Sequence, residues 1–238
     1  MPENARAVQS RARRPPPEAE PIDLVVLYQD EWLIAIDKPP GMVVHPTYRN
    51  WSGTLLNGLL WHVRSRTGTE PRIVTRLDKD TSGIVLVALT SDVHARIQID
   101  AAGRHVLKEY LAIVHGTPAP PRGSIALPLG RSVADRRRVV VDPSGQESRT
   151  DYEVLASEDG RSVVRCALVT GRTHQIRVHL AARGWPVLGD RVYGEPNETV
   201  PRQALHAWRL TLPHPVSRQV LQLEAPLPAD LRALVVGL

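Results

Sequence analysis

An uninterrupted apolar run, IVLVAL at residues 84–89, limits the folds open to this chain more than any other segment. It shows no alternation of polar and apolar residues, which is the pattern of a strand buried on both faces. Gly83 precedes the run, while Thr90 and Ser91 follow it as capping residues. The pattern predicts a central strand in a sheet that is covered on both sides.

The eight residues RLDKDTSG at 76–83 hold two carboxylates, two cations and two hydroxyls. Asp78 and Asp80 stand where a calcium-binding loop has its first two ligands. The twelfth position of such a loop must supply a bidentate carboxylate and is Leu89 here, so we exclude a calcium site. An aspartyl-phosphate site receives its carboxylate from the end of a preceding strand, whereas here the apolar strand follows Asp78.

Two interpretations of this segment remain open from its residues alone. It is either a loop that presents Asp78 as a nucleophile or acid-base group beside Arg76, or a well hydrogen-bonded turn without chemistry. In both cases we expect the side chains of Asp80, Thr81 and Ser82 to bond to backbone groups and tie the turn.

The chain is moderately basic. Its 238 residues include 30 lysines and arginines against 25 aspartates and glutamates, which gives a net charge of +5 and a sequence pI of about 9.8. Such an excess suits a polyanionic partner, and an ordinary cationic surface explains it equally well. The arginines that predict one basic face are Arg131, Arg136, Arg137, Arg138, Arg172, Arg177 and Arg183.

Cysteine and histidine usage gives no sign of a disulfide or a metal site. Cys166 is the only cysteine, so an internal disulfide and a CxxC motif are both excluded. His174 and His179 are five positions apart, which does not match the i, i+4 spacing of a helical zinc pair, and we expect no metal. No apolar segment reaches the roughly 18 residues that a membrane helix needs. We expect a soluble protein of the reducing cytoplasm.

The composition changes near residue 22. Residues 1–21 are rich in proline and arginine and almost lack large apolar side chains, so we expect a disordered tail. Residues 22–238 are expected to form one α+β domain with a mixed, largely antiparallel sheet flanked by helices, because short links join many strands. Strands are predicted near 24–28, 32–36, 83–89, 107–115, 123–127, 138–142, 148–155, 162–169, 204–212 and 219–224, and helices near 54–64, 91–102, 173–183 and from 230.

The segment GRTHQIRVHL places Arg172 and Thr173 at the start of a predicted helix. His174, Arg177 and Ala181 then share one helix face. Cations in a first turn oppose the helix dipole, and a bound phosphate or carboxylate would remove that conflict. A solvated helix face explains the same pattern, so both interpretations stay open.

Tyr110 lies on a strand face that it shares with Lys108, Ala112 and Val114. A tyrosine at such a position is more often a core residue than a catalyst. The chain has five tryptophans, five tyrosines and no phenylalanine, which is too few for an interleaved basic and aromatic array that stacks on a single strand.

Taken together, these segments resemble the RluA-type RNA pseudouridine synthases. The resemblance runs in order through nearly everything after the tail, and seven ordered blocks make chance an implausible explanation. The blocks are KPPGMVVHP (38–46), RLDKDTSG (76–83), KEYLAIVHG (108–116), GRTHQIRVHL (171–180), LGDRVYG (188–194), LHAWRL (205–210) and APLPADL (225–231).

The resemblance implies the pseudouridine synthase fold with a basic catalytic cleft, and it implies roles for particular residues. Asp78 is then the catalytic aspartate, Tyr110 contacts the target base and Arg177 pairs with Asp78. Arg76 fills the gap that the flipped uridine leaves in the RNA. The partner of the protein is then a structured RNA, such as a stem-loop of ribosomal or transfer RNA, and we expect Arg172 and His174 to contact that RNA.

Two departures from the family pattern stand out. Thr75 replaces the histidine that usually precedes the Arg-Leu-Asp, and the 21-residue tail is too short to be the S4 RNA-binding domain that some members carry. Thr75 adjoins the loop and leaves Asp78 itself matched. We therefore expect a member without an S4 domain, acting as a monomer.

The chemistry of the implied reaction needs no cofactor, because it exchanges an N1–C1′ bond for a C5–C1′ bond without redox change. An ionised aspartate either attacks covalently or takes the 2′ proton, and the sequence leaves both open. A different class of function is also open, namely a non-catalytic RNA-binding or RNA-chaperone protein that kept the fold. An aspartyl-phosphate enzyme is a more distant alternative.

Overall fold

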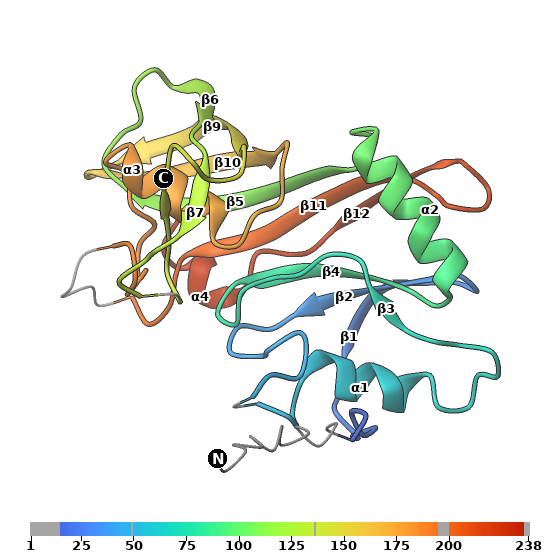
Figure 1. Ribbon diagram of the computed structural model, residues 1–238. Helices are drawn as coiled ribbons and strands as arrows, with labels where there is room; N and C mark the ends of the chain where they lie inside the picture. The colour runs from blue at the N-terminus through green and yellow to red at the C-terminus, as the bar shows by residue number, and fades with distance from the viewer. Residues whose placement is uncertain (1–14, 49, 136, 195–199, 236–238) are drawn as a thin grey trace, which may run out of the picture.

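The computed structural model describes residues 15–48, 50–135, 137–194 and 200–235, which build one large mixed sheet with helices on both faces (Figure 1). In spatial order the sheet runs β1 (Val25–Gln29), β2 (Leu33–Lys38), β4 (Ser82–Ala88), β11 (Leu205–Pro213), β5 (Leu107–His115), β10 (Arg161–Leu168), β9 (Arg149–Glu158) and β6 (Arg122–Ala126). Off this path, β12 (Val220–Glu224) pairs with β11 and β3 (Arg72–Ile73) with β4, while β7 (Leu129–Arg131) and β8 (Val139–Val141) form a separate hairpin. The helices are α1 (Leu55–His62), α2 (Ser91–Ala102), α3 (Gln175–Ala182) and α4 (Ala229–Arg232).

The central strand β4 is buried along its whole length, as the apolar run predicts. Its side chains alternate between two cores because successive residues of a strand point to opposite faces. Ile84 and Leu86 pack in the cluster that includes Val93 and Ile97 of α2. On the other face, Val85 and Val87 pack with Leu55 and Leu59 of α1.

Every described pairing in the large sheet is antiparallel except that of β4 with β11, which confirms the predicted mixed, largely antiparallel α+β fold. In this parallel pair, Ser82 lies opposite His206 and Gly83 opposite Ala207. Gly83 has φ +109°, and a Cβ there would lie 2.2 Å from the carbonyl oxygen of Ala207. A glycine is therefore required where the polar octapeptide enters the sheet.

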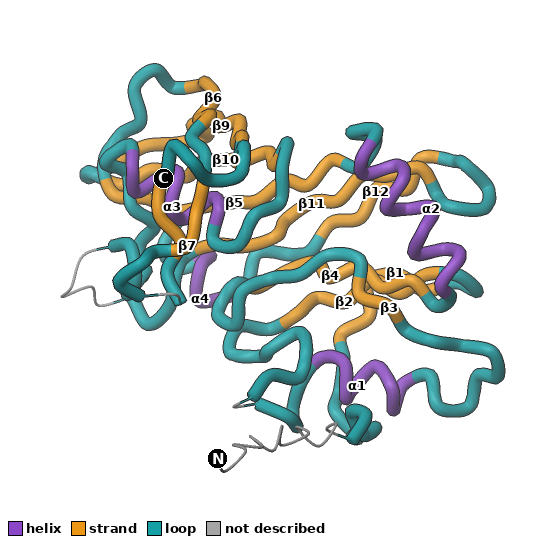
Figure 2. The backbone as a smooth tube through the Cα atoms, in the orientation of Figure 1, coloured by secondary structure: helices purple, strands orange, loops and turns teal. Residues whose placement is uncertain are grey.

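The second half of the sheet, β5, β10 and β9, carries α3 (Figure 2). Ile176 and Leu180 of α3 pack in one cluster with Tyr110 of β5 and Cys166 of β10. In this arrangement α3 lies in one half of the molecule, whereas α1 and α2 cover the two faces of the other half (Figure 1).

The segment before residue 22 is partly tied to α1. The side-chain amide of Asn57 donates to the Glu18 carbonyl at 2.7 Å, and the backbone N–H of Gly53 donates to Oε2 of Glu20 at 2.9 Å. Residues 1–14 of the predicted tail lie outside the described residues. Among the described residues, no helix has the length and apolar character needed to cross a membrane.

The predicted start of the third long helix was wrong. α3 begins at Gln175, and His174 before it has the left-handed backbone conformation, with φ +55° and ψ +15°. Arg172 and Thr173 therefore lie outside the helix, so the expected conflict of Arg172 with the helix dipole does not arise. The short strands β3 and β7 have no counterpart among the predicted elements.

Candidate active site

The octapeptide loop is fixed from one side by Lys38, at the end of β2. Its side chain is fully buried, and its ammonium group donates to the carbonyls of Pro39 at 2.7 Å, Met42 at 3.0 Å and Lys79 at 3.0 Å. All three N–H donors are thus used. Burial lowers the pKa of this amine from 10.5 to about 8, against the opposing charge of Asp80.

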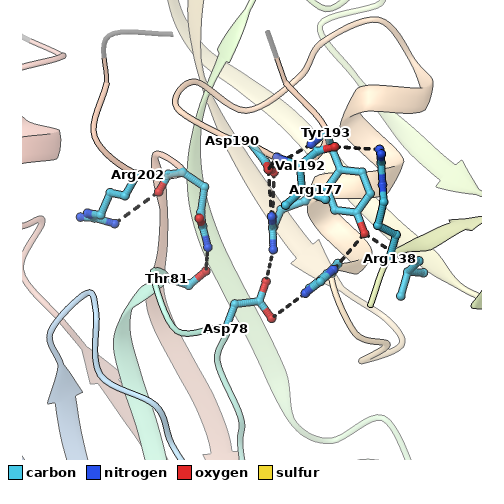
Figure 3. A network of polar contacts seen from close by, with 11 residues as sticks. Asp78, Thr81, Arg138, Arg177, Asp190, Val192, Tyr193 and Arg202 are labelled. Carbon is cyan, nitrogen blue, oxygen red and sulfur yellow. Dashed lines mark hydrogen bonds and ion pairs between the residues drawn. The ribbon is translucent and has the colours of Figure 1, made fainter. Parts of the chain in front are cut away.

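From the other side, the loop is fixed by the residues that lead into β11 (Figure 3). Arg202 donates from Nη1 to the Asp80 carbonyl at 3.1 Å, and Gln203 donates to the Thr81 hydroxyl oxygen at 3.3 Å. Arg202 is itself held by Asp230 of α4, at 2.7 and 3.0 Å. The loop that carries Asp78 is therefore pre-organised by buried groups from distant parts of the chain.

Asp78 is the outer member of a row of three charged side chains that continues into the interior (Figure 3). Its Oδ2 accepts a hydrogen bond of 2.7 Å from Nη1 of Arg177 in α3. The rest of the guanidinium group is occupied by Asp190, which accepts from Nε at 2.7 Å and from Nη2 at 2.8 Å. Oδ1 of Asp190 also accepts the backbone N–H groups of Val192 at 3.0 Å and Tyr193 at 3.2 Å.

The electrostatics of Arg177 and Asp190 follow from this geometry. Burial alone would raise the pKa of Asp190, but the hydrogen bonds and charge of Arg177, helped by the backbone N–H groups of Val192 and Tyr193, hold that pKa below its usual value. Burial alone would lower the pKa of Arg177, but Asp190 and Asp78 raise it. Arg177 is therefore a permanently charged, rigidly oriented donor to Asp78.

His174 lies on the other side of Asp78. Its Nε2 is 3.8 Å from Oδ1 of Asp78, and its Nδ1 is 2.9 Å from the hydroxyl oxygen of Tyr193. Burial lowers the pKa of His174, and the negative charge of Asp78 offsets part of that effect. Oδ2 of Asp78 is thus hydrogen-bonded to Arg177, whereas Oδ1 has only a longer contact with the His174 imidazole.

Asp78, His174 and Arg177 line a cleft of about 710 Å³. Other residues of the lining come from the connection between β7 and β8 and from the segments on either side of residues 195–199: Asp135, Arg137, Arg138, Gly189, Arg191, Val192, Pro201, Arg202 and Gln203. Cations outnumber acids along it: the cations are Lys79, Arg137, Arg138, Arg177, Arg191 and Arg202, and the acids are Asp78, Asp80 and Asp135. The predicted basic cleft is thus present around Asp78. Arg136 of the predicted basic cluster lies outside the described residues.

The chain that builds this cleft matches a known family. The family model described as RNA pseudouridylate synthase matches residues 32–182, which include Asp78, Tyr110 and Arg177. The chain belongs to the RNA pseudouridylate synthase family. The predicted family and enzyme class, an isomerase, are thereby confirmed.

Individual members of this pseudouridylate synthase family show how far the likeness extends. "Ribosomal large subunit pseudouridine synthase D" of Nitrosomonas europaea is 45% identical over 229 residues, covering 92% of this chain and 66% of that protein. An uncharacterized RNA pseudouridine synthase of Bacillus subtilis, YlyB, is 40% identical over 226 residues, covering 92% of this chain and 74% of that protein. The solved structure of human RNA pseudouridylate synthase domain containing 1 has a TM-score of 0.71 at 29% identity, with 86% of this chain and 83% of that chain covered.

Three of the predicted site residues of this synthase do not line the cleft. Tyr110 is 8% exposed and lines a separate small hollow with Thr75 and Ile84. Burial, followed by the charge of Asp78, raises the pKa of its phenol, so the hydroxyl stays protonated. Arg76 is exposed beside the loop, and Arg172 is exposed with its Nε donating to the Glu147 carbonyl at 3.3 Å.

The sequence did not single out Asp190, Tyr193, Lys38 or Arg202. Asp190 and Tyr193 belong to the LGDRVYG block and Lys38 to the KPPG block, so the blocks were visible but the roles were not. The only sequence signal for Asp190 and Tyr193 was that the LGDRVYG block contains an acid and a tyrosine to which no role had been assigned. Among the described residues, no three His, Cys, Asp or Glu side chains are grouped so that they could hold a metal ion.

Proposed function

We propose that Asp78 starts the conversion of a flipped uridine to pseudouridine in ribosomal RNA or transfer RNA. The observation that supports this most directly is the Asp78 and Arg177 pair at the wall of a basic cleft of about 710 Å³. Arg177 fixes Oδ2, whereas Oδ1 has no hydrogen bond from the described residues. One oxygen of a firmly held carboxylate is thus available to react.

The isomerisation breaks N1–C1′ and forms C5–C1′. Asp78 Oδ1 serves either route, attack at C1′ or removal of the 2′ proton, because both need one unoccupied carboxylate oxygen. No electrons are gained or lost overall, so the reaction proceeds without a redox cofactor, and we propose that it needs no metal.

The detached base needs a surface on which to turn, and the RNA needs support after flipping. In the proposed complex Tyr110 contacts the uracil through its ring. The charge of Asp78 contributes to the raised pKa of the Tyr110 phenol, which supports a place for Tyr110 near the reacting carboxylate. Arg76, exposed two positions before Asp78, enters the stack that the uridine leaves. Arg172 and His174 contact the RNA around the site.

The substrate is proposed to be a short stem-loop, acted on by a cytoplasmic monomer. The cations of the cleft suit phosphate oxygens, which position an RNA but carry little sequence information. The names of relatives such as the ribosomal large subunit pseudouridine synthase D of Nitrosomonas europaea support ribosomal RNA as the first substrate to test.

Release of tritium from RNA labelled at uridine C5 tests the proposal, because isomerisation replaces the C5–H bond. The wild type should release tritium, and Asp78→Asn should release none while it still binds the RNA. Asp80→Asn is the matched control, since Asp80 is the neighbouring carboxylate of the same loop and lines the same cleft; it should keep most of the release.

Two outcomes would contradict the proposal. Release from Asp78→Asn at the wild-type rate would remove Asp78 from the reaction. A wild type that binds RNA tightly and releases nothing from any stem-loop or ribosomal RNA would favour the non-catalytic RNA-binding function.

A further inference from the structure

The hydroxyl of Tyr193 links the cleft to a strand hairpin. Within the part of the chain that the structure describes, this hydroxyl has two polar contacts. The backbone N–H of Val139, in β8, donates to it at 2.9 Å. Nδ1 of His174 lies 2.9 Å away. The two rings meet edge to face, with centroids 5.7 Å apart and an interplanar angle of 71°.

These contacts favour one position for the proton of the imidazole. A phenol has one hydrogen to donate, and its oxygen also accepts. The Val139 N–H already donates to this oxygen, and Nδ1 of His174 is the other polar atom at hydrogen-bond distance, so the hydroxyl hydrogen of Tyr193 has an acceptor in Nδ1. In that arrangement Nδ1 accepts, and a neutral His174 carries its proton on Nε2. That atom lies 3.8 Å from Oδ1 of Asp78.

We propose that Tyr193 is a positioning residue that fixes His174 with its proton on Nε2, so that His174 offers an N–H donor to an acceptor oxygen of the target nucleotide beside Oδ1 of Asp78. The part of this inference that concerns the nucleotide rests on the proposed function, whereas the tautomer does not. His174 thereby becomes a direct contact of the reacting nucleotide.

The surroundings of His174 agree with a neutral imidazole. Burial is the largest influence on its pKa and lowers it, and the positive charges of Arg177 and Arg131 act in the same direction. The carboxylates of Asp78 and Asp190 raise the pKa, but they do not reverse the net lowering. At neutral pH the ring has a single proton, so its position on Nδ1 or Nε2 matters.

The backbone at His174 is constrained as well. Its φ of +55° is unusual for a residue other than glycine, and such conformations persist where the surroundings enforce them. Gln175 supplies part of that enforcement, since its Oε1 accepts from the Arg172 N–H at 3.0 Å and from the Thr170 hydroxyl at 2.8 Å. The ring is thus aimed at Asp78 by a turn that is itself tied down.

Nitrogen NMR of the wild-type protein tests the tautomer directly. A long-range proton–nitrogen correlation spectrum, with the His174 signals assigned by their absence in His174→Asn, should show the proton on Nε2 at neutral pH. In Tyr193→Phe the preference should weaken or reverse, because Nδ1 has lost its donor. A proton on Nδ1 in the wild type, or an unchanged spectrum in Tyr193→Phe, overturns the proposal.

Kinetic measurements test the proposed contact of His174 with the nucleotide. Loss of one oriented hydrogen bond should lower kcat of Tyr193→Phe about tenfold, with KM for RNA little changed. His174→Gln places an amide N–H near the Nε2 position, whereas His174→Asn places it near Nδ1. The glutamine variant should therefore be the faster one. If His174 mattered only because it adopts the left-handed backbone conformation, asparagine would be the better substitute, since asparagine tolerates that conformation. A faster asparagine variant would therefore overturn the proposal.

The outcomes separate this inference from the proposed function. An inactive wild type with the proton on Nε2 would contradict the proposed function and the nucleotide contact, and would leave the tautomer established. An active wild type whose Tyr193→Phe variant shifts the tautomer but keeps kcat would overturn the contact with the nucleotide alone.

Discussion

Among single residues, Asp190 contributes most to holding Arg177 in place. It is fully buried and occupies two of the guanidinium nitrogens, which leaves Nη1 for Asp78. An arginine side chain on its own has many rotamers, and the fork with Asp190 selects one of them. The direction from which Asp78 is held is therefore set by a carboxylate that is fully buried.

Asp190→Asn is expected to lower both stability and turnover. Breaking a buried ion pair by removing one charge costs about 3 kcal/mol, which urea unfolding should measure. kcat should fall more than KM rises, because Asp78 loses its fixed orientation. Asp135→Asn is the control, since Asp135 pairs with Arg137 at the exposed rim of the same cleft. Unchanged stability and kcat in Asp190→Asn would contradict the anchoring role.

Local sequence patterns predicted some residues of the site and missed others. Asp78 stands out because it lies in a dense polar segment, and the resemblance led to Arg177, whose Nη1 lies 2.7 Å from it. Asp190 and Lys38 give no such local signal. Their roles depend on burial against atoms that are far away in sequence, such as the Lys79 carbonyl 41 positions from Lys38.

Lys38 predicts a specific pH dependence of stability. Its pKa is about 8 in the folded protein against 10.5 in the unfolded chain. The unfolded chain therefore binds more protons between these pH values, and stability rises with pH across that window. Relative to Lys38→Met, the wild type should gain about 3 kcal/mol of unfolding free energy from pH 8 to 10.5. A flat difference, measured by urea unfolding, would show that the amine is not perturbed.

At the scale of elements, the join between β4 and β11 decides the position of the loop. The apolar run predicted β4 and its burial, and the predicted elements include both strands. Their parallel pairing could not be predicted, because residues 82 and 206 are 124 positions apart and no local pattern specifies their contact. The start of α3 was missed because His174, the residue before it, has a left-handed backbone conformation and makes no side-chain cap hydrogen bond, and the sequence pattern showed neither.

Gly83→Ala should disrupt this join. The new Cβ would meet the Ala207 carbonyl oxygen at 2.2 Å, and a backbone atom cannot step aside without moving the strand. We expect a loss of about 3 kcal/mol or more in urea unfolding, together with lost tritium release. Gly184→Ala is the matched control, since Gly184 has φ +81° with nothing within 4 Å. It should cost only about 1 kcal/mol from backbone strain. Equal losses in the two variants would argue against close packing at Gly83.

At the scale of the whole molecule, the sequence conveyed the charge pattern in part. Of the arginines expected on one basic face, Arg137, Arg138 and Arg177 line the cleft, whereas Arg131, Arg172 and Arg183 do not. The other cations of the lining are Lys79, Arg191 and Arg202. The sequence did not show which arginines are free to bind RNA. Arg177 and Arg202 are committed to Asp190 and Asp230 inside the protein, whereas Arg191 is exposed on the cleft.

RNA binding should therefore weaken steeply with salt, and Arg191 should account for part of that dependence. Each phosphate that a cation neutralises releases counterions, so Arg191→Gln should reduce the slope of log K against log salt by about 1. Arg104→Gln is the control, because Arg104 is also exposed but follows α2 and does not line the cleft; its slope should match the wild type. Binding of one ribosomal stem-loop, titrated at several salt concentrations, measures all three slopes. If Arg191→Gln and Arg104→Gln leave the same slope, the RNA backbone does not follow the cleft around Asp78, and another face of the protein must carry the contacts.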